Sequence, residues 1–166
     1  MNSNYFTESV RKLRTDEKIP YDLLLLADET IEAIDKCIED SEIYILEKQQ
    51  KILGVYVLQF IDKRSVEIKY IAVDEKFQGQ GIGTFLLEDA ILRAKKNGFE
   101  NITIKTGDCG IKQLHLYQKV GFEIFDVEKN FFIDNFPEHI YEDGRLCKDR
   151  VILKKIIMNL KKENPN

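Results

Sequence analysis

A strand that runs into a glycine-rich turn and then into a helix is the feature that most constrains the fold. Residues 67–73 read as a strand, and residues 82–96 carry apolar side chains with a helical period. Asp89 and Arg93 form an i,i+4 pair in that helix, and Asn97-Gly98 ends it. Between strand and helix, three glycines fall within five positions: Gly79, Gly81 and Gly83.

The glycine turn has two open interpretations. Glycines let backbone N–H groups approach an anion, and the helix N-terminus adds partial positive charge. The first acid of the helix is Glu88, so its positive end is free for a phosphate. The turn could equally be a tight strand–helix connection. A dinucleotide fingerprint fails because Thr84 and Leu86 occupy the required glycine positions, and no Gly-Lys-Ser/Thr of a P-loop occurs.

The other elements predict an α/β fold with a mixed sheet. Pro20 opens a short helix, and Thr30 caps a second one through Glu39. We expect an antiparallel meander of three strands, followed by helix, strand, helix and two strands. The predicted strands are 42–47, 52–61, 66–73, 102–105, 122–127 and one within 145–157, and the later helices are 82–96 and 111–119.

Composition bounds the class of protein. With 166 residues, 43% hydrophobic and 33% charged, the chain predicts one domain over residues 1–160 and a frayed tail at 161–166. A net charge of −4 argues against a nucleic-acid partner. No apolar run approaches the ~18 residues of a membrane helix, and no signal peptide is evident, so we expect a cytoplasmic protein that does not bind membranes.

The cysteines predict neither a disulfide nor a metal site. Cys37, Cys109 and Cys147 are odd in number and form no C-x-x-C pair, and His115 and His139 lack metal-site spacing. We expect three reduced structural thiols and no bound metal.

Two motifs in register resemble the GNAT (GCN5-related N-acetyltransferase) superfamily. Gln78-x-x-Gly81-x-Gly83 is similar to its acetyl-CoA signature, and Leu116-Tyr117-x-x-x-Gly121-Phe122 is similar to a downstream segment about 35 residues further on. The resemblance implies a mixed central sheet of about seven strands with flanking helices. It also implies acetyl transfer from acetyl-CoA to a primary amine, by direct attack in a ternary complex.

The resemblance further implies where acetyl-CoA binds. The turn would hold the pyrophosphate, and the strand before it would pair with pantetheine where the sheet opens toward residues 102–105. Many members carry an Asn ahead of the tyrosine, whereas this chain has Gly110 and Gln113, so Asp108 or Cys109 is left to make that contact. The implied cofactor-binding residues are Ile71, Ala72, Val73, Gln78, Gly79, Gln80, Gly81, Ile82, Gly83, Thr84, Asp108 and Tyr117.

Two catalytic roles follow from the resemblance. Tyr117 matches the tyrosine that protonates the departing thiolate, and a backbone N–H near Ile71 or Val73 would stabilise the oxyanion. Strand alternation places Glu67 and Lys69 on one face with Ile71 and Val73. Glu67 matches a general-base position; the alternative is a Glu–Lys pair on a solvated strand face.

The acceptor side is predicted between the last two strands. Residues 126–143 contain six acids against one Lys, together with several aromatic side chains. Such a segment suits a small cationic amine through charge and cation–π contacts, or is a solvated loop. The predicted substrate-binding residues are Lys69, Phe132, Glu138 and Tyr141. Alternatives are a protein lysine or N-terminal acetyltransferase, or an inactive CoA-binding regulatory module; a homodimer is a family expectation.

Overall fold

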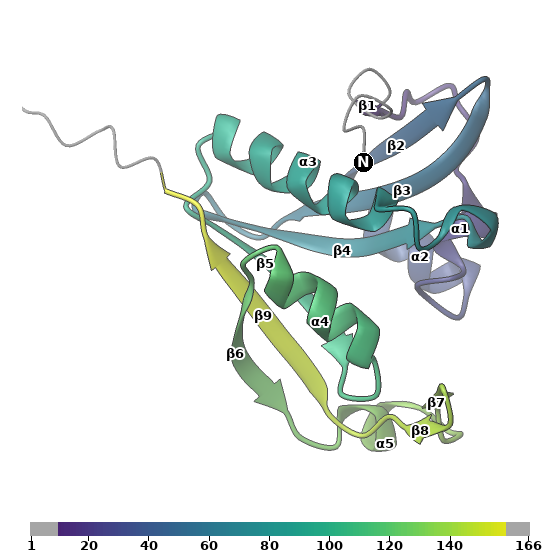
Figure 1. The fold of residues 1–166 in the computed structure, drawn as a ribbon, viewed down its shortest axis with the longest axis vertical. Coiled ribbons are helices and arrows are strands. Elements are labelled where there is room, and N and C mark those ends of the chain that lie inside the picture. Colours follow the sequence, from purple (N-terminus) through teal and green to yellow (C-terminus); the bar gives the residue numbers. More distant parts are fainter. Residues whose placement is uncertain (1–9, 159–166) are drawn as a thin grey trace, which may run out of the picture.

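The computed structural model describes residues 10–158, which form a seven-stranded mixed sheet flanked by helices (Figure 1). The strand order is β1-β2-β3-β4-β5-β9-β6, and β7 and β8 form a separate hairpin. The strands are β1 (Val10–Lys12), β2 (Ser41–Lys48), β3 (Lys51–Phe60), β4 (Ser65–Val73), β5 (Asn101–Gly107), β6 (Glu123–Glu128), β7 (Tyr141–Glu142), β8 (Arg145–Leu146) and β9 (Arg150–Ile156). The helices are α1 (Tyr21–Leu24), α2 (Ile31–Ile38), the 3₁₀ turn η2 (Glu75–Phe77), α3 (Ile82–Lys96), α4 (Ile111–Lys119) and α5 (Phe131–Asn135).

The sheet divides between β4 and β5, its parallel pair. Ser65–Ile68 pairs with Asn101–Ile104, after which β4 continues to Val73 and β5 to Gly107 without pairing to each other. Figure 1 shows the two strands starting side by side and then diverging. The expected opening of the sheet is therefore present, and the facing edges of both strands keep free backbone groups there.

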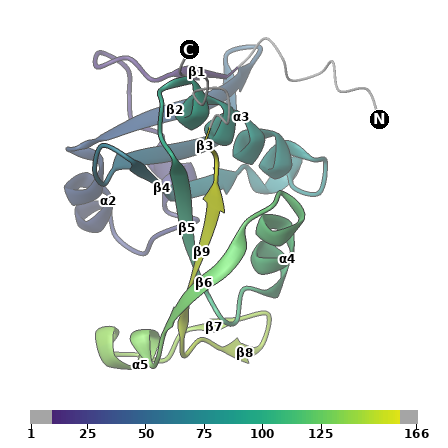
Figure 2. The same cartoon turned by 90° about the vertical axis from the view of Figure 1, so that its left-hand side faces the viewer.

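Helices cover both faces of the sheet (Figure 2). On one face, α3 and α4 bury Leu86, Leu87 and Tyr117 in a core cluster with the sheet. On the other face, α1 and α2 bury Leu24 and Ile34 against the sheet in a second cluster. Thr30 accepts a hydrogen bond from the N–H of Ala33, which confirms the predicted cap of α2.

A β-bulge in β4 overturns the predicted alternation of that strand. Val57 of β3 pairs with Tyr70 and Leu58 pairs with Ile68, so Lys69 is an extra residue. Residues two positions apart in a regular strand share a face. Here Ile68 packs in the α3-face cluster and Tyr70 in the α2-face cluster, on opposite sides of the sheet. The prediction that Glu67 and Lys69 share a face with Ile71 and Val73 is wrong, because the bulge reverses the facing of every residue after it.

The remaining predicted helices and strands are confirmed, with boundaries within a few residues. The sequence did not predict β1, α5 or the β7–β8 hairpin, since each is too short to show a periodic pattern. The predicted tail at 161–166 lies outside the described residues. Within residues 10–158, no helix combines the length and the apolar character needed to cross a bilayer.

The prediction of three reduced thiols is wrong for two of them. Cys109 and Cys147 form a disulfide, and their Cα atoms lie 4.9 Å apart. The pairing depends on the β7–β8 hairpin, which brings Cys147 back to the start of α4. Cys37 is a free, buried thiol of α2, as predicted.

Candidate active site

A cavity of about 530 Å³ lies where β4 and β5 diverge. It reaches from the end of β4 to the first turn of α3 and across to α4. Because it is lined from both faces of β4, the cavity passes through the opening of the sheet. We call it the divergence cavity; its lining residues are Leu26, Ile71, Ala72, Val73, Phe77, Gln78, Gly79, Gly81, Ile82, Gly83, Thr84, Lys112, Gln113, Leu116, Tyr117 and Lys119.

The glycine turn gives the cavity an anion-binding wall. Gly81 is the N-cap of α3 with φ of +87°, a left-handed conformation that favours glycine, and no side chain caps the helix. The first turn of α3 contains no acid. The side-chain amide of Gln78 donates to the carbonyl of Val73 at 3.0 Å and ties the turn to the end of β4. The N–H groups of this helix end therefore face the cavity with the positive end of the helix dipole.

Tyr117 lies on the opposite wall, on α4. Its side chain is 5% exposed and packs edge-on against Phe122, with ring centroids 6.4 Å apart. Burial, and secondarily the negative charge of Glu142, raises the pKa of the Tyr117 phenol above its ordinary value. The phenol is accordingly a neutral proton donor at physiological pH.

Helix α4 also brings polar groups that the sequence analysis did not assign. Lys112 and Lys119 line the divergence cavity, seven residues apart on one face of the helix. Their spacing on either side of Tyr117 is the sequence signal that could have identified them. Gln113 lies between them: its Nε2 donates to Glu142 at 2.9 Å, and its buried Oε1 has no hydrogen-bond partner. The two lysines are available to a phosphate-bearing ligand. The Gln113 carbonyl is available to an amide donor.

Glu67 lies on the face of the sheet that α2 covers, and its carboxylate is close to two lysine ammonium groups. Its carboxylate is 3.1 Å from Lys105 Nζ and 3.9 Å from Lys69 Nζ, and the residue is only 3% exposed. Val66 and Ile68, on either side of Glu67 in β4, both pack in the α3-face cluster, so Glu67 faces the α2 side of the sheet. Glu67 does not line the divergence cavity; it pairs with Thr103, one position before the last pair of β4 and β5.

A second cavity of about 240 Å³ lies between the α1–α2 loop and the segment that follows α5. We call it the loop cavity, and we call residues 131–147 the lid. Two carboxylates, Glu29 and Glu138, line the loop cavity together with His139. Tyr70 donates to Asp28 and so holds the α1–α2 loop against β4.

Several predicted site residues lie outside both cavities. Gln80 is exposed in the turn, and Tyr141 is 62% exposed at the hairpin. The Asp108 carboxylate accepts from the backbone N–H of Lys148 at 2.9 Å, so it joins two chain segments. Phe132 stacks on Phe136, with ring centroids 5.7 Å apart, in the base of the lid. Of the four predicted acceptor contacts, Glu138 is the one that lines a cavity.

This arrangement defines a class of protein. A sheet divided at a parallel pair, with an anion-binding helix end on one side and a buried tyrosine on the other, suits a long phosphate-bearing ligand that threads the opening. The comparison with known proteins identifies the class: residues 7–122 match the model of the Acetyltransferase (GNAT) family, and the chain belongs to that family.

Individual relatives agree with the family match. The chain is 44% identical over 133 residues to the uncharacterized N-acetyltransferase YvbK of Bacillus subtilis, covering 80% of this chain and 86% of that protein. A GNAT family acetyltransferase from Elizabethkingia anophelis with acetyl-CoA bound has a TM-score of 0.86 and 47% identity, over 89% of this chain and 97% of the other. A Bacillus subtilis acetyltransferase in complex with CoA has a TM-score of 0.85 and 39% identity, over 90% and 99%. The chain is therefore an acetyl-CoA-dependent N-acetyltransferase with the GNAT fold.

Proposed function

We propose that the protein transfers the acetyl group of acetyl-CoA to the primary amine of a small cationic molecule, which binds in the loop cavity. The observation that carries this proposal is that two acidic residues from separate loops, Glu29 and Glu138, line one cavity. A volume of about 240 Å³ is near the lower end of the ligand-pocket range of roughly 300–1,000 Å³ and favours a small acceptor.

The turn at 78–84 and the lysines of α4 bind the phosphates of acetyl-CoA. The N–H groups at the start of α3 meet the pyrophosphate, and Lys112 and Lys119 lie across the cavity from them. The edge of β4 at 71–73 lacks a neighbouring strand there, which leaves its backbone free to pair with the pantetheine amides. Gln113, whose Oε1 is unpaired, takes the place of the Asn found in many relatives.

The reaction needs a proton acceptor on the amine side and a proton donor on the thiolate side. Tyr117 is the donor, because its phenol is neutral and lines the divergence cavity. A backbone N–H at Ile71 or Val73 stabilises the oxyanion that forms as the amine attacks the thioester carbonyl.

Glu67 is the proton acceptor, acting through water. It lies on the α2 face, which is the side of the sheet that the α1–α2 loop covers. Lys69 and Lys105 stabilise negative charge on its carboxylate. A water molecule between the amine and Glu67 would carry the proton to this carboxylate.

A kinetic comparison of four proteins tests this assignment. Wild type, Glu138→Gln, Glu67→Gln and the matched control Asp134→Asn are assayed with acetyl-CoA and a panel of mono- and polyamines, by release of free CoA thiol. Asp134 is an exposed acid of α5 that does not line the loop cavity. We expect Glu138→Gln to raise KM for the amine about fivefold, which corresponds to about 1 kcal/mol of lost attraction, with KM for acetyl-CoA unchanged.

Glu67→Gln is expected to lower kcat about 100-fold with little change in either KM. Asp134→Asn should match wild type. Equal effects of Glu138→Gln and Asp134→Asn would contradict an acceptor in the loop cavity. Transfer to protein lysines or N-termini but to no small amine would show a protein acetyltransferase, and tight CoA binding without any transfer would show a regulatory module.

A further inference from the structure

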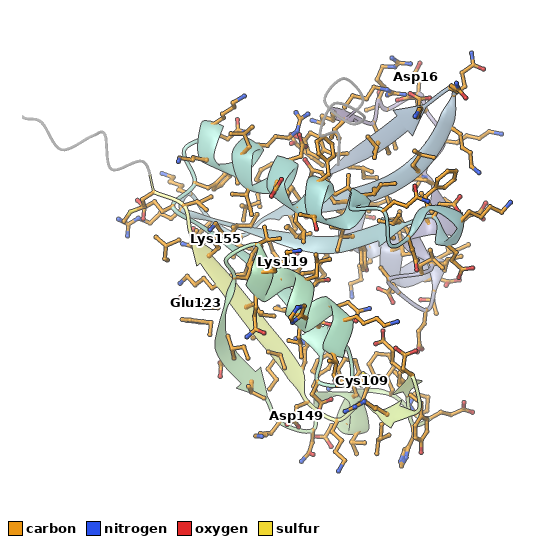
Figure 3. All side chains as sticks on the ribbon, in the orientation of Figure 1. Asp16, Cys109, Lys119, Glu123, Asp149 and Lys155 are labelled. Atoms are coloured by element: carbon orange, nitrogen blue, oxygen red, sulfur yellow. A yellow bond between two sulfur atoms is a disulfide. The ribbon has the colours of Figure 1, made fainter. Side chains whose placement is uncertain are left out.

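A covalent bond ties the tip of the lid to the start of the helix that carries Tyr117. Cys109 immediately precedes Gly110, the N-cap of α4, and Cys147 directly follows β8. Figure 3 shows Cys109 beside the β7–β8 hairpin, at the end of α4 opposite Lys119. Both cysteines are nearly buried, at 5% and 3% exposed. The bond closes a segment with a sequence separation of 38 residues, and this segment includes all of α4 and the whole lid.

The disulfide lies next to the catalytic face of α4. Gln113 and Tyr117 are four residues apart and share one side of α4, while Cys109 lies just before its N-cap, Gly110. Glu142 of β7 accepts a hydrogen bond from Gln113 Nε2 at 2.9 Å, and its carboxylate lies 3.8 Å from Cys109 Sγ. The hairpin is therefore joined by a covalent link to the residue before the N-cap of α4 and by a hydrogen bond to Gln113, one helical turn from Tyr117.

The base of the lid has separate attachments. The Asp108 N–H donates to the Asp149 carbonyl at 2.9 Å, and the Phe132 N–H donates to the Lys148 carbonyl at 2.9 Å. The Arg150 guanidinium lies 3.6 Å from the ring centroid of Phe131. Opening of the disulfide would consequently leave the tip, residues 137–147, held to α4 by the Gln113–Glu142 hydrogen bond, while α5 and β9 stay in place. Phe136 stays with the base through its stacking on Phe132.

We propose that Cys109 and Cys147 form a reversible thiol–disulfide site, and that reduction of this bond frees the lid tip and weakens acceptor binding. The part of the inference that concerns the acceptor rests on the proposed function, because residues 136–140 line the loop cavity. The turn at 78–84 joins η2 to α3 and lies outside the segment that the disulfide closes, so the phosphate contacts of its N–H groups do not depend on the state of the bond.

The chemical step is exchange with a dithiol. One thiolate of the reductant attacks a sulfur of the Cys109–Cys147 bond, that bond breaks, and the other cysteine leaves as a thiolate that takes up a proton. The second reductant thiol then displaces the first cysteine and closes a disulfide within the reductant. In total the protein gains two electrons and two protons, and the dithiol is oxidised.

The reduced site needs a chelator in any assay. The donor atoms of Cys109, Cys147 and Glu142 lie within 4.8 Å of one another, and two thiolates with a carboxylate can capture Zn²⁺. A captured ion would hold the hairpin in place and conceal the effect of reduction. All measurements on the reduced protein therefore include EDTA.

The experiment compares the protein oxidised with glutathione disulfide and reduced with dithiothreitol. Alkylation after denaturation counts the thiols: we expect one in the oxidised chain, from Cys37, and three in the reduced chain. Hydrogen exchange then follows the lid tip, including the Cys147 N–H that donates to the Ile140 carbonyl. We expect exchange there to be about tenfold faster after reduction, KM for the amine to rise several-fold, and the Kd of acetyl-CoA to change much less than that KM.

Two variants are matched controls. Cys109→Ser/Cys147→Ser should reproduce the reduced state and not respond to dithiothreitol, whereas Cys37→Ala should respond as wild type does. Equal lid exchange in the oxidised and reduced proteins would overturn the proposal, as would three free thiols after oxidation. A difference in lid exchange supports the redox site even if no amine is acetylated; that result would count against the proposed acceptor alone.

Discussion

At the scale of single residues, Tyr117 shows how burial sets chemistry. A phenol in water titrates near pH 10, and removal from water raises that pKa because the phenolate loses its hydration. In this protein the Glu142 carboxylate adds to the effect. The phenol therefore keeps its proton throughout the pH range in which an amine becomes nucleophilic, and it can deliver that proton when a thiolate departs.

Replacement of Tyr117 by Phe tests this role. Tyr117→Phe keeps the ring contact with Phe122 and removes only the proton donor. We expect kcat to fall about 100-fold or more, while the shape of the pH profile from pH 6 to 9 is retained, because a phenol with a raised pKa does not titrate in that range. Steady-state kinetics at several pH values provide the measurement. Unchanged turnover across the range would show that the thiolate takes its proton elsewhere.

At the scale of elements, the start of α3 leaves its N–H groups free for an anion and lacks the side-chain cap that normally stabilises a helix start. Its N-cap is a glycine without a capping side chain, and its first turn lacks acids. Helix starts ordinarily gain stability from a Ser, Thr, Asp or Asn cap. Here those N–H groups stay free, which makes them available to the phosphates of acetyl-CoA.

Two glycines of α3 make a matched pair for testing this point. Gly81 before the helix and Gly98 after it have φ of +87° and +84°, and a Cβ at either position would meet no protein atom within 4 Å. Alanine at each should therefore lower the free energy of unfolding by a similar amount, about 1 kcal/mol. Only Gly81→Ala is expected to weaken acetyl-CoA binding, by at least about tenfold, the equivalent of about 1.4 kcal/mol.

Calorimetric titration with acetyl-CoA and thermal unfolding of both variants provide the measurement. Equal losses of affinity in the two variants would show that the glycine turn acts through stability and not through contact with the ligand.

At the scale of the whole molecule, buried tyrosines couple the fold to pH. Burial raises the pKa of Tyr44, Tyr56, Tyr70 and Tyr117, in each case as the largest cause. A group with a raised pKa binds its proton more tightly in the folded state. Its contribution to stability is therefore complete below the unfolded pKa near 10 and is lost as the pH rises above that value.

We expect the melting temperature to fall steeply above pH 10. Each of these tyrosines can contribute at most about 1.4 kcal/mol per pH unit in that range. Tyr56→Phe is the informative variant, because Asp89, which accepts from the Tyr56 hydroxyl at 2.5 Å, keeps its partner Arg93 at 2.8 Å. The variant should lose less stability between pH 9 and 11 than wild type does. The measurement is thermal unfolding of both proteins across this pH range. If the melting temperatures of the variant and of wild type fall equally, groups other than Tyr56 control the loss of stability at alkaline pH.

The sequence by itself determined the order of the main elements and the residues of the glycine turn that lines the divergence cavity. Hydrophobic period, caps and glycines are local properties, so they predicted α2, α3, α4 and the three-stranded meander, together with the turn at 78–84. The family resemblance assigned Tyr117 the role of proton donor from its motif, and the structure places Tyr117 in the lining of the divergence cavity together with that turn. These features depend on neighbours a few positions away in the chain, and for that reason the sequence shows them.

Only the tertiary structure decided which groups meet across the fold. The bulge at Lys69 is defined by pairing with β3, and it leaves Glu67, with Lys105 as a partner, on the face opposite Ile71 and Val73. The Cys109–Cys147 bond exists because a two-strand hairpin folds back onto α4. Register and long-range pairing result from the packing of segments far apart in sequence, and no local pattern encodes them. The face of the Glu67 carboxylate and the attachment of the lid were therefore settled by packing alone.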